Sequence, residues 1–103
     1  MSLEELYTNL SSTAIPVYYD HAPEGTKLPF ATYTVGSNNF DADNKVYKKG
    51  FALRLVLYVG TKDTSKEEMI ETLLDSLEIP WEREEIFISE ENVYQEIYTG
   101  EIP

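Results

Sequence analysis

Residues 51–59 read FALRLVLYV and have the clearest strand pattern in the chain. Successive side chains of an extended strand point to opposite faces of its sheet. One face of this strand is wholly apolar and consists of Phe51, Leu53, Leu55, Leu57 and Val59. The other face is mixed and consists of Ala52, Arg54, Val56 and Tyr58. The pattern predicts a strand with one side on the core and the other side partly covered or wet.

An amphipathic helix is predicted at the start of the chain. Ser2 and Glu5 have the spacing of a capping box, in which the two residues satisfy free amide groups of the first helical turn. The apolar face of the segment that follows consists of Leu3, Leu6, Tyr7 and Leu10. We therefore expect a helix over about residues 2–11 that packs against the rest of the domain.

A second capping box follows the central strand, at Thr64 and Glu67. It precedes apolar residues at helical spacing, which are Met69, Ile70, Leu73, Leu74 and Leu77. The spacing predicts an amphipathic helix over residues 65–78. The side expected to face solvent carries Glu67, Glu68, Glu71 and Asp75.

Four more segments have the β-branched and aromatic content or the alternation of strands. They are residues 17–19, 30–35, 81–89 and 93–99. Residues 20–29 hold two prolines and a glycine and are predicted to form a loop, and residues 90–92 a tight hairpin turn. The predicted fold is therefore α+β, with a mostly antiparallel sheet of about five strands packed against two helices.

The composition indicates one domain spanning residues 1–103, with 42% hydrophobic residues and no cysteine. Disulfides and thiolate metal sites are therefore excluded. The start, MSLEELYTNL, lacks the basic residues and apolar run of a secretory signal. No apolar run approaches the roughly 20 residues that cross a bilayer. We expect a soluble protein that is made in a cytoplasm and has no membrane partner.

The net charge of -11 lies entirely in the second part of the chain. Residues 1–62 contain six acidic and six basic residues, whereas residues 63–103 contain thirteen acidic residues against Lys66 and Arg83. Tight binding to nucleic acid requires the opposite sign, because lysine and arginine must replace the counterions of the phosphates. DNA is therefore not expected as a bound ligand, although a surface that repels passing DNA is compatible with this charge.

The only histidine, His21, lies next to Asp20 in a proline-containing loop. This pair could be half of a catalytic triad, but Ser11 and Ser12 lack the flanking glycines of a nucleophile elbow. The five glycines are isolated and form no phosphate-binding loop. Paired carboxylates in residues 84–96 resemble a solvated acidic face as much as a hydrolase pair. We therefore expect neither catalysis nor a cofactor.

Residues 37–49 read SNNFDADNKVYKK, an oxygen-rich run that begins like a calcium-binding loop at Asp41 and Asp43. Three positions depart from a calcium loop. Lys45 replaces an oxygen ligand, Val46 replaces the required glycine, and Ala52 replaces the bidentate glutamate. These departures favour a solvated connection over a metal site.

Phe40 and Tyr47 set this connection apart from a simple loop. A connection of about 15 residues is longer than a hairpin requires, and long ordered loops are often functional. An aromatic residue ringed by polar groups is typical of an interface anchor. The alternative is that both aromatic residues fold back on the core of their own chain, and the residues alone leave both readings open.

The order of several short motifs resembles the siphophage tail terminator and tail-to-head joining (tail completion) proteins. The motifs are Pro29-Phe30-x-x-Tyr33, Asn39-Phe40-x-Ala42-Asp43-Asn44-x-x-Tyr47, Leu57-Tyr58, a Glu-rich amphipathic helix, and closing strands with Tyr94 and Tyr98. The similarity extends over nearly the whole chain. It implies a small α+β subunit that assembles into a ring, usually of six copies.

The resemblance also implies a place and partners for such a subunit. The ring would end the tail tube of a phage or prophage and join it to the head–tail connector protein, in the virion tail after assembly in the host cytoplasm. The contact residues would be Asn39, Phe40, Asp41, Asp43 and Tyr47. DNA would pass through without binding, and acids that could face this lumen are Glu84, Glu85, Glu90 and Glu91.

Two other functions remain as alternatives. A monomeric acidic module that binds a protein, or inhibits one by mimicking nucleic acid, would need its carboxylates in a spaced surface array. Residues 82–91 are the only candidate for such an array. A small enzyme would use Asp20 and His21, and the absence of a partner motif disfavours it.

Overall fold

The computed structural model of the protein describes residues 3–42, 45–60 and 64–102, and the side chains of these residues except those of residue 3 and residues 37–51. In this part of the chain the helices are α1 (Leu3–Ser11) and α2 (Thr64–Ser76). The strands are β1 (Val17–Tyr19), β2 (Phe30–Ala42), β3 (Lys45–Val59), β4 (Trp81–Ile88) and β5 (Val93–Ile102).

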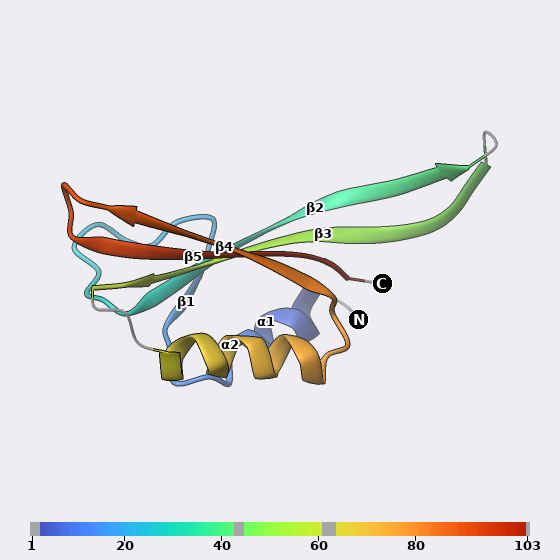
Figure 1. The fold of residues 1–103 in the computed structure, drawn as a ribbon. Helices are drawn as coiled ribbons and strands as arrows, with labels where there is room; N and C mark the ends of the chain where they lie inside the picture. Colours follow the sequence, from blue (N-terminus) through green and yellow to red (C-terminus); the bar gives the residue numbers. More distant parts are fainter. Residues whose placement is uncertain (1–2, 43–44, 61–63, 103) are drawn as a thin grey trace.

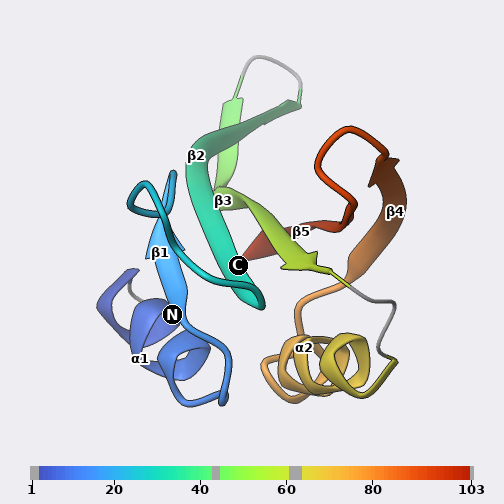
Figure 2. The ribbon, with the colours of Figure 1, turned by 90° about the vertical axis from the view of Figure 1, so that its left-hand side faces the viewer.

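The strands form one sheet in the order β1-β2-β3-β5-β4. Strand β1 runs parallel to β2, whereas the β2–β3, β3–β5 and β4–β5 pairs are antiparallel. The α+β class is therefore confirmed, with a mixed sheet of which only the short β1 pairing is parallel. Both helices cover the same face of the sheet (Figures 1 and 2). Helix α1 lies beneath β1 and β2, and α2 lies on the side of the sheet that ends in β4.

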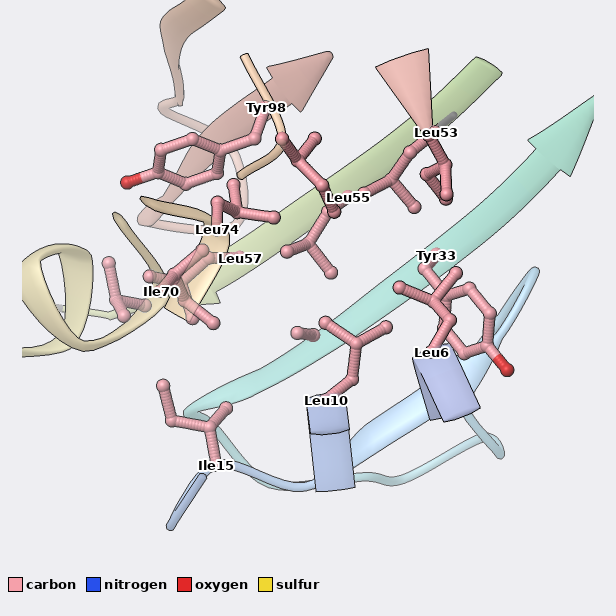
Figure 3. Packing of buried hydrophobic residues seen from close by; sticks show 14 residues of the cluster. Leu6, Leu10, Ile15, Tyr33, Leu53, Leu55, Leu57, Ile70, Leu74 and Tyr98 are labelled. Atoms are coloured by element: carbon pink, nitrogen blue, oxygen red, sulfur yellow. The ribbon is translucent and has the colours of Figure 1, made fainter. Parts of the chain in front are cut away.

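The core lies between the helices and the sheet, and β3 is its centre (Figure 3). The expected core face of this strand is confirmed for Leu53, Leu55, Leu57 and Val59, which are all buried. The opposite face of β3 is mixed as expected, because Val56 is buried while Arg54 is exposed.

Each helix contributes the apolar face that its spacing predicts. Leu6 and Leu10 of α1 are buried, whereas Tyr7 is half exposed. Ile70 and Leu74 of α2 are buried against the sheet. The expectation that Glu67 faces solvent is wrong: its residue exposure is 3%, and its carboxylate lies against a cation from β4.

The connection between the two central strands is not the irregular loop that its composition predicts. Strands β2 and β3 stay paired through Asn38↔Gly50 to Ala42↔Lys45, with one register shift between Phe40 and Asp41. Antiparallel pairing satisfies backbone groups whatever the side chains are, so polar residues can continue a hairpin that apolar residues begin. We call residues 38–42 of β2 and 45–50 of β3 the arm.

The arm projects beyond the layer formed by the helices and the rest of the sheet (Figure 1). The molecule measures 47 × 27 × 25 Å along its principal axes, and its radius of gyration is 14.7 Å. A compact domain of this length has a radius of gyration of about 13 Å. The long axis therefore reflects a domain body with one extension. Neither described helix is long and apolar enough to cross a membrane.

Candidate functional site

Two features of the molecule exceed what a stable fold requires, and the first is the arm. Strand β1 pairs with β2 only opposite Ala31–Tyr33, and β5 pairs with β3 only from Phe51 onward. Within the described residues, the arm's two outer edges therefore pair with no other strand. Unpaired strand edges are templates for a strand from another chain.

The predicted contact residues lie on the arm as far as the structure describes them. Asn39, Phe40 and Asp41 belong to β2, and Tyr47 belongs to β3. Their side chains lie outside the described part of the structure, as does Asp43 altogether. Phe40 lies roughly 10 Å along β2, at about 3.3 Å per residue, from the last position at which β2, β3 and β5 are all paired.

The second feature is a group of charged side chains between α2 and the β4–β5 pair. We call Glu67, Glu71, Glu85 and Glu96 the carboxylate cluster. Arg83 Nη1 donates to Glu67 Oε1 and to Glu71 Oε2, both at 3.2 Å. The Tyr98 hydroxyl donates to Glu71 Oε2 at 2.9 Å. The region between helix and sheet is therefore polar here, beside an otherwise apolar core.

The strand register explains why these residues meet. Glu85 pairs with Glu96 and Arg83 pairs with Tyr98, so the four side chains share one face of the β4–β5 pair. That face is the one that α2 covers, and on α2 Glu67 and Glu71 lie one turn apart. Residues from three elements thus converge because of tertiary pairing.

Glu96 is the most unusual member of the cluster. It is fully buried, and neither of its carboxylate oxygens accepts a hydrogen bond from a described residue. Glu96 forms an ion pair with Arg83, whose Nε lies 3.9 Å from Glu96 Oε2. Burial, and secondarily the carboxyl groups of Glu85 and Glu67, raise the pKa of Glu96 to about 8. A neutral Glu96 carboxyl therefore predominates at neutral pH.

One oxygen from each of Glu67, Glu85 and Glu96 lies within 4.8 Å of the other two. Glu67 and Glu96 are buried, whereas Glu85 is exposed and connects the group to solvent. This cluster was missed at the sequence level, although a signal exists. Glu96 falls in the same strand phase as Tyr94 and Tyr98, so alternation assigns it to the covered face.

The four acids proposed for a DNA-facing surface do not form one group. Glu84 is exposed on the face of β4 that points away from the helices, whereas Glu85 lies on the helix-facing side in the cluster. Glu90 and Glu91 are exposed in the turn between β4 and β5. The structure therefore separates Glu85 from the other three.

The disfavoured enzyme site is an exposed pair. His21 Nδ1 lies 3.0 Å from Asp20 Oδ2, and both side chains are mostly exposed. A hollow of about 600 Å³ lies elsewhere, where β3, β5 and the start of β4 meet. Thr99 is the only hydroxyl residue among those that line it in the described structure, and no histidine lines it. Asp20 and His21 line a separate hollow of about 300 Å³, which Thr26, Thr32 and Tyr58 also line.

Comparison with protein-family models, with curated proteins and with solved structures gave no match.

Proposed function

We propose that this protein is a non-catalytic structural subunit that assembles with further copies of itself through the arm. The observation that carries the proposal is the projecting hairpin, whose outer edges pair with no other described strand. An isolated two-stranded hairpin is marginally stable in water, so a long one gains stability when a partner covers it. A neighbouring subunit would supply that cover.

A closed ring is the assembly that such an arm suits. A ring requires a heterologous contact, in which one patch of a subunit meets a different patch of the next one. An extension at one end of a domain supplies one half of that contact, and the body of the neighbour supplies the other half. Phe40 and Tyr47, which lie on the arm by sequence, would then be buried by the neighbour rather than by their own core.

Within this class we propose a ring of the siphophage tail terminator kind, with six copies. It would end the tail tube, contact the tube protein and the head–tail connector protein, and reside in the virion tail. The support is the ordered set of motifs that resembles this family, together with exposed acids at Glu84, Glu90 and Glu91. A surface along which DNA passes should repel phosphate groups.

The geometry favours this role over the acidic mimic. Strand alternation places Glu82 and Glu84 on one face of β4 and Arg83 and Glu85 on the other. Arg83 and Glu85 take part in contacts near α2, so the acids of residues 82–91 do not form a continuous array. A nucleic-acid mimic requires such an array.

The decisive experiment removes the arm and leaves the body. Residues 38–50 are replaced by Asn-Gly, a two-residue hairpin turn that joins the paired residues Ser37 and Phe51. We expect the wild-type protein to form oligomers in light scattering as its concentration rises, or to cap the ends of purified tail-tube polymer in electron micrographs. The shortened variant should do neither while keeping its helical circular dichroism.

Two results would contradict the proposal. One is a wild-type protein that stays monomeric at high concentration and leaves tube ends uncapped. The other is a shortened variant that assembles as well as the wild-type protein, because assembly would then use the body alone.

A further inference from the structure

The carboxylate cluster brings acidic side chains from α2, β4 and β5 close together. Glu67 and Glu71 of α2 and Glu96 of β5 each form an ion pair with Arg83 of β4. The guanidinium lies toward α2, with Nη1 at 3.2 Å from Glu67 and from Glu71. Its approach to Glu96 is longer, at 3.9 Å from Nε. The guanidinium therefore lies closer to the carboxylates of α2 than to the Glu96 carboxyl.

The buried oxygens of Glu96 point to a ligand beside this carboxyl. A buried polar atom without a hydrogen-bond partner destabilises a folded protein, and native structures contain few of them. Both oxygens of Glu96 are of this kind, and the side chain is fully buried. They face the carboxylates of Glu67 and Glu85, which offer no proton when ionised. A cation between the three groups would give the Glu96 oxygens the partner that they lack.

The spacing of the oxygens fits a metal ion. One oxygen each from Glu67, Glu85 and Glu96 lies within 4.8 Å of the others. Oxygen ligands lie about 2.0–2.6 Å from Mg²⁺ or Ca²⁺, so two ligands of one ion are separated by at most about 5 Å. We propose that Glu67, Glu85 and Glu96 bind one divalent cation of the class that prefers oxygen ligands, namely Ca²⁺, Mg²⁺ or Mn²⁺.

The chemistry and the location of the site set its selectivity. All three ligands are carboxylates, with no imidazole or thiolate, which disfavours Zn²⁺ and Cu²⁺ relative to harder ions. Glu85 is exposed, so the ion can enter from solvent, and water can complete its coordination. Because the ligands come from α2, β4 and β5, a bound ion would tie the second helix to the edge of the sheet. This inference does not depend on the arm or on the proposed assembly.

The test is a titration of the full chain after treatment with a chelator. MnCl₂, CaCl₂ and MgCl₂ are added separately in isothermal titration calorimetry at pH 8, where fewer protons compete for the carboxylates. Sodium chloride at 150 mM suppresses loose binding to exposed acids. We expect one ion per chain for at least one metal, and a rise in melting temperature with that metal.

Variants assign the binding to the cluster. Glu96→Gln and Glu85→Gln should each weaken binding at least tenfold, since each removes one charged ligand. Glu84→Gln is the matched control, because Glu84 neighbours Glu85 on β4 but is exposed on the opposite face. It should bind as the wild-type protein does. Circular dichroism and the metal-free melting temperature show whether each variant is folded, and Glu85→Gln tests the site should Glu96→Gln fail to fold.

Two outcomes would overturn the inference. The first is the absence of stoichiometric heat and of any melting shift with all three metals up to 10 mM, because protons alone would then neutralise the cluster. The second is equal metal binding by the wild-type, Glu85→Gln and Glu84→Gln proteins, because the ions would then bind elsewhere on the acidic surface.

Discussion

Burial of Glu96 should make the stability of the metal-free protein fall as the pH rises. Its pKa is raised to about 8 from the ordinary value of 4.5, first by burial and then by the carboxyl groups of Glu85 and Glu67. Between these two pH values the folded state holds a proton that the unfolded state has released. The folded state therefore binds more protons, and the free energy of unfolding decreases with rising pH.

The surrounding groups determine how large this effect is. The Glu96 carboxyl lies near Glu67 of α2 and near Glu85 and Arg83 of β4. Glu71 of α2 contacts Arg83 and Tyr98 of β5 in turn. Burial raises the pKa of Tyr98 above the ordinary tyrosine value, which is itself high, so the Tyr98 hydroxyl stays neutral below pH 9. Each pKa unit corresponds to about 1.4 kcal/mol. The contribution of Glu96 should therefore fall by about 4 kcal/mol between pH 5 and pH 9 and level off above pH 8.

The comparison that isolates this contribution is Glu96→Gln. Glutamine has nearly the same shape and does not titrate, so the other ionisable groups affect both proteins alike. Urea denaturation in the presence of a chelator, at one-unit steps from pH 5 to pH 9, gives the free energy of unfolding of each protein. Relative to the variant, the wild-type protein should lose about 4 kcal/mol across this range. Glu101→Gln, an exposed carboxylate on the same strand, should follow the wild-type curve.

Parallel curves for the wild-type protein and Glu96→Gln would refute this reasoning. So would a wild-type protein that gains stability relative to the variant as the pH rises. Either result would mean that Glu96 is already ionised in the folded state at low pH and that donors or cations satisfy its oxygens.

Two further predictions concern packing and hydrogen bonding beside the cluster. Gly100→Ala should destabilise the protein by about 1–3 kcal/mol in urea denaturation, because its Cβ would lie 2.5 Å from the Pro80 carbonyl oxygen. Gly36→Ala is the control and should cost much less, since a Cβ at Gly36 would have no neighbouring atom within 4 Å. Equal losses for the two variants would show that the close approach to Pro80 is relaxed without cost. Tyr98→Phe should reduce the free energy of unfolding by roughly 1.5–3 kcal/mol at pH 7, since it removes a donor to the Glu71 carboxylate while keeping the buried ring. An unchanged midpoint in the same assay would mean that water or Arg83 replaces the hydroxyl.

Much of the fold follows from periodicity within short segments. Alternation in residues 51–59 identified the centre of the sheet, and helical spacing after Thr64 identified the helix that covers it. These patterns are local consequences of where side chains point in a strand or a helix, so a single sequence reveals them. The same reasoning placed Leu6 and Leu10 correctly in the core.

The arm shows where local reasoning fails. Its polar residues have the composition of a loop, yet each strand is held by backbone pairing with the other. Backbone hydrogen bonds do not depend on side-chain polarity, so composition does not reveal how far a hairpin extends past its core. The parallel pairing of β1 with β2 was missed for a similar reason, because it depends on how residues 20–29 lead back to the start of β2.

Sequence patterns were enough to predict the class of the fold, the core positions of β3 and α2, and a strongly acidic second part of the chain. The burial of Glu67 and its approach to Glu85 and Glu96 depend instead on tertiary packing. The three residues are separated by 11 to 29 positions in the chain, and they converge through strand register and helix docking. A helical pattern shows which residues share a face, but the chain that packs against that face decides whether a carboxylate meets water, a guanidinium or another carboxylate.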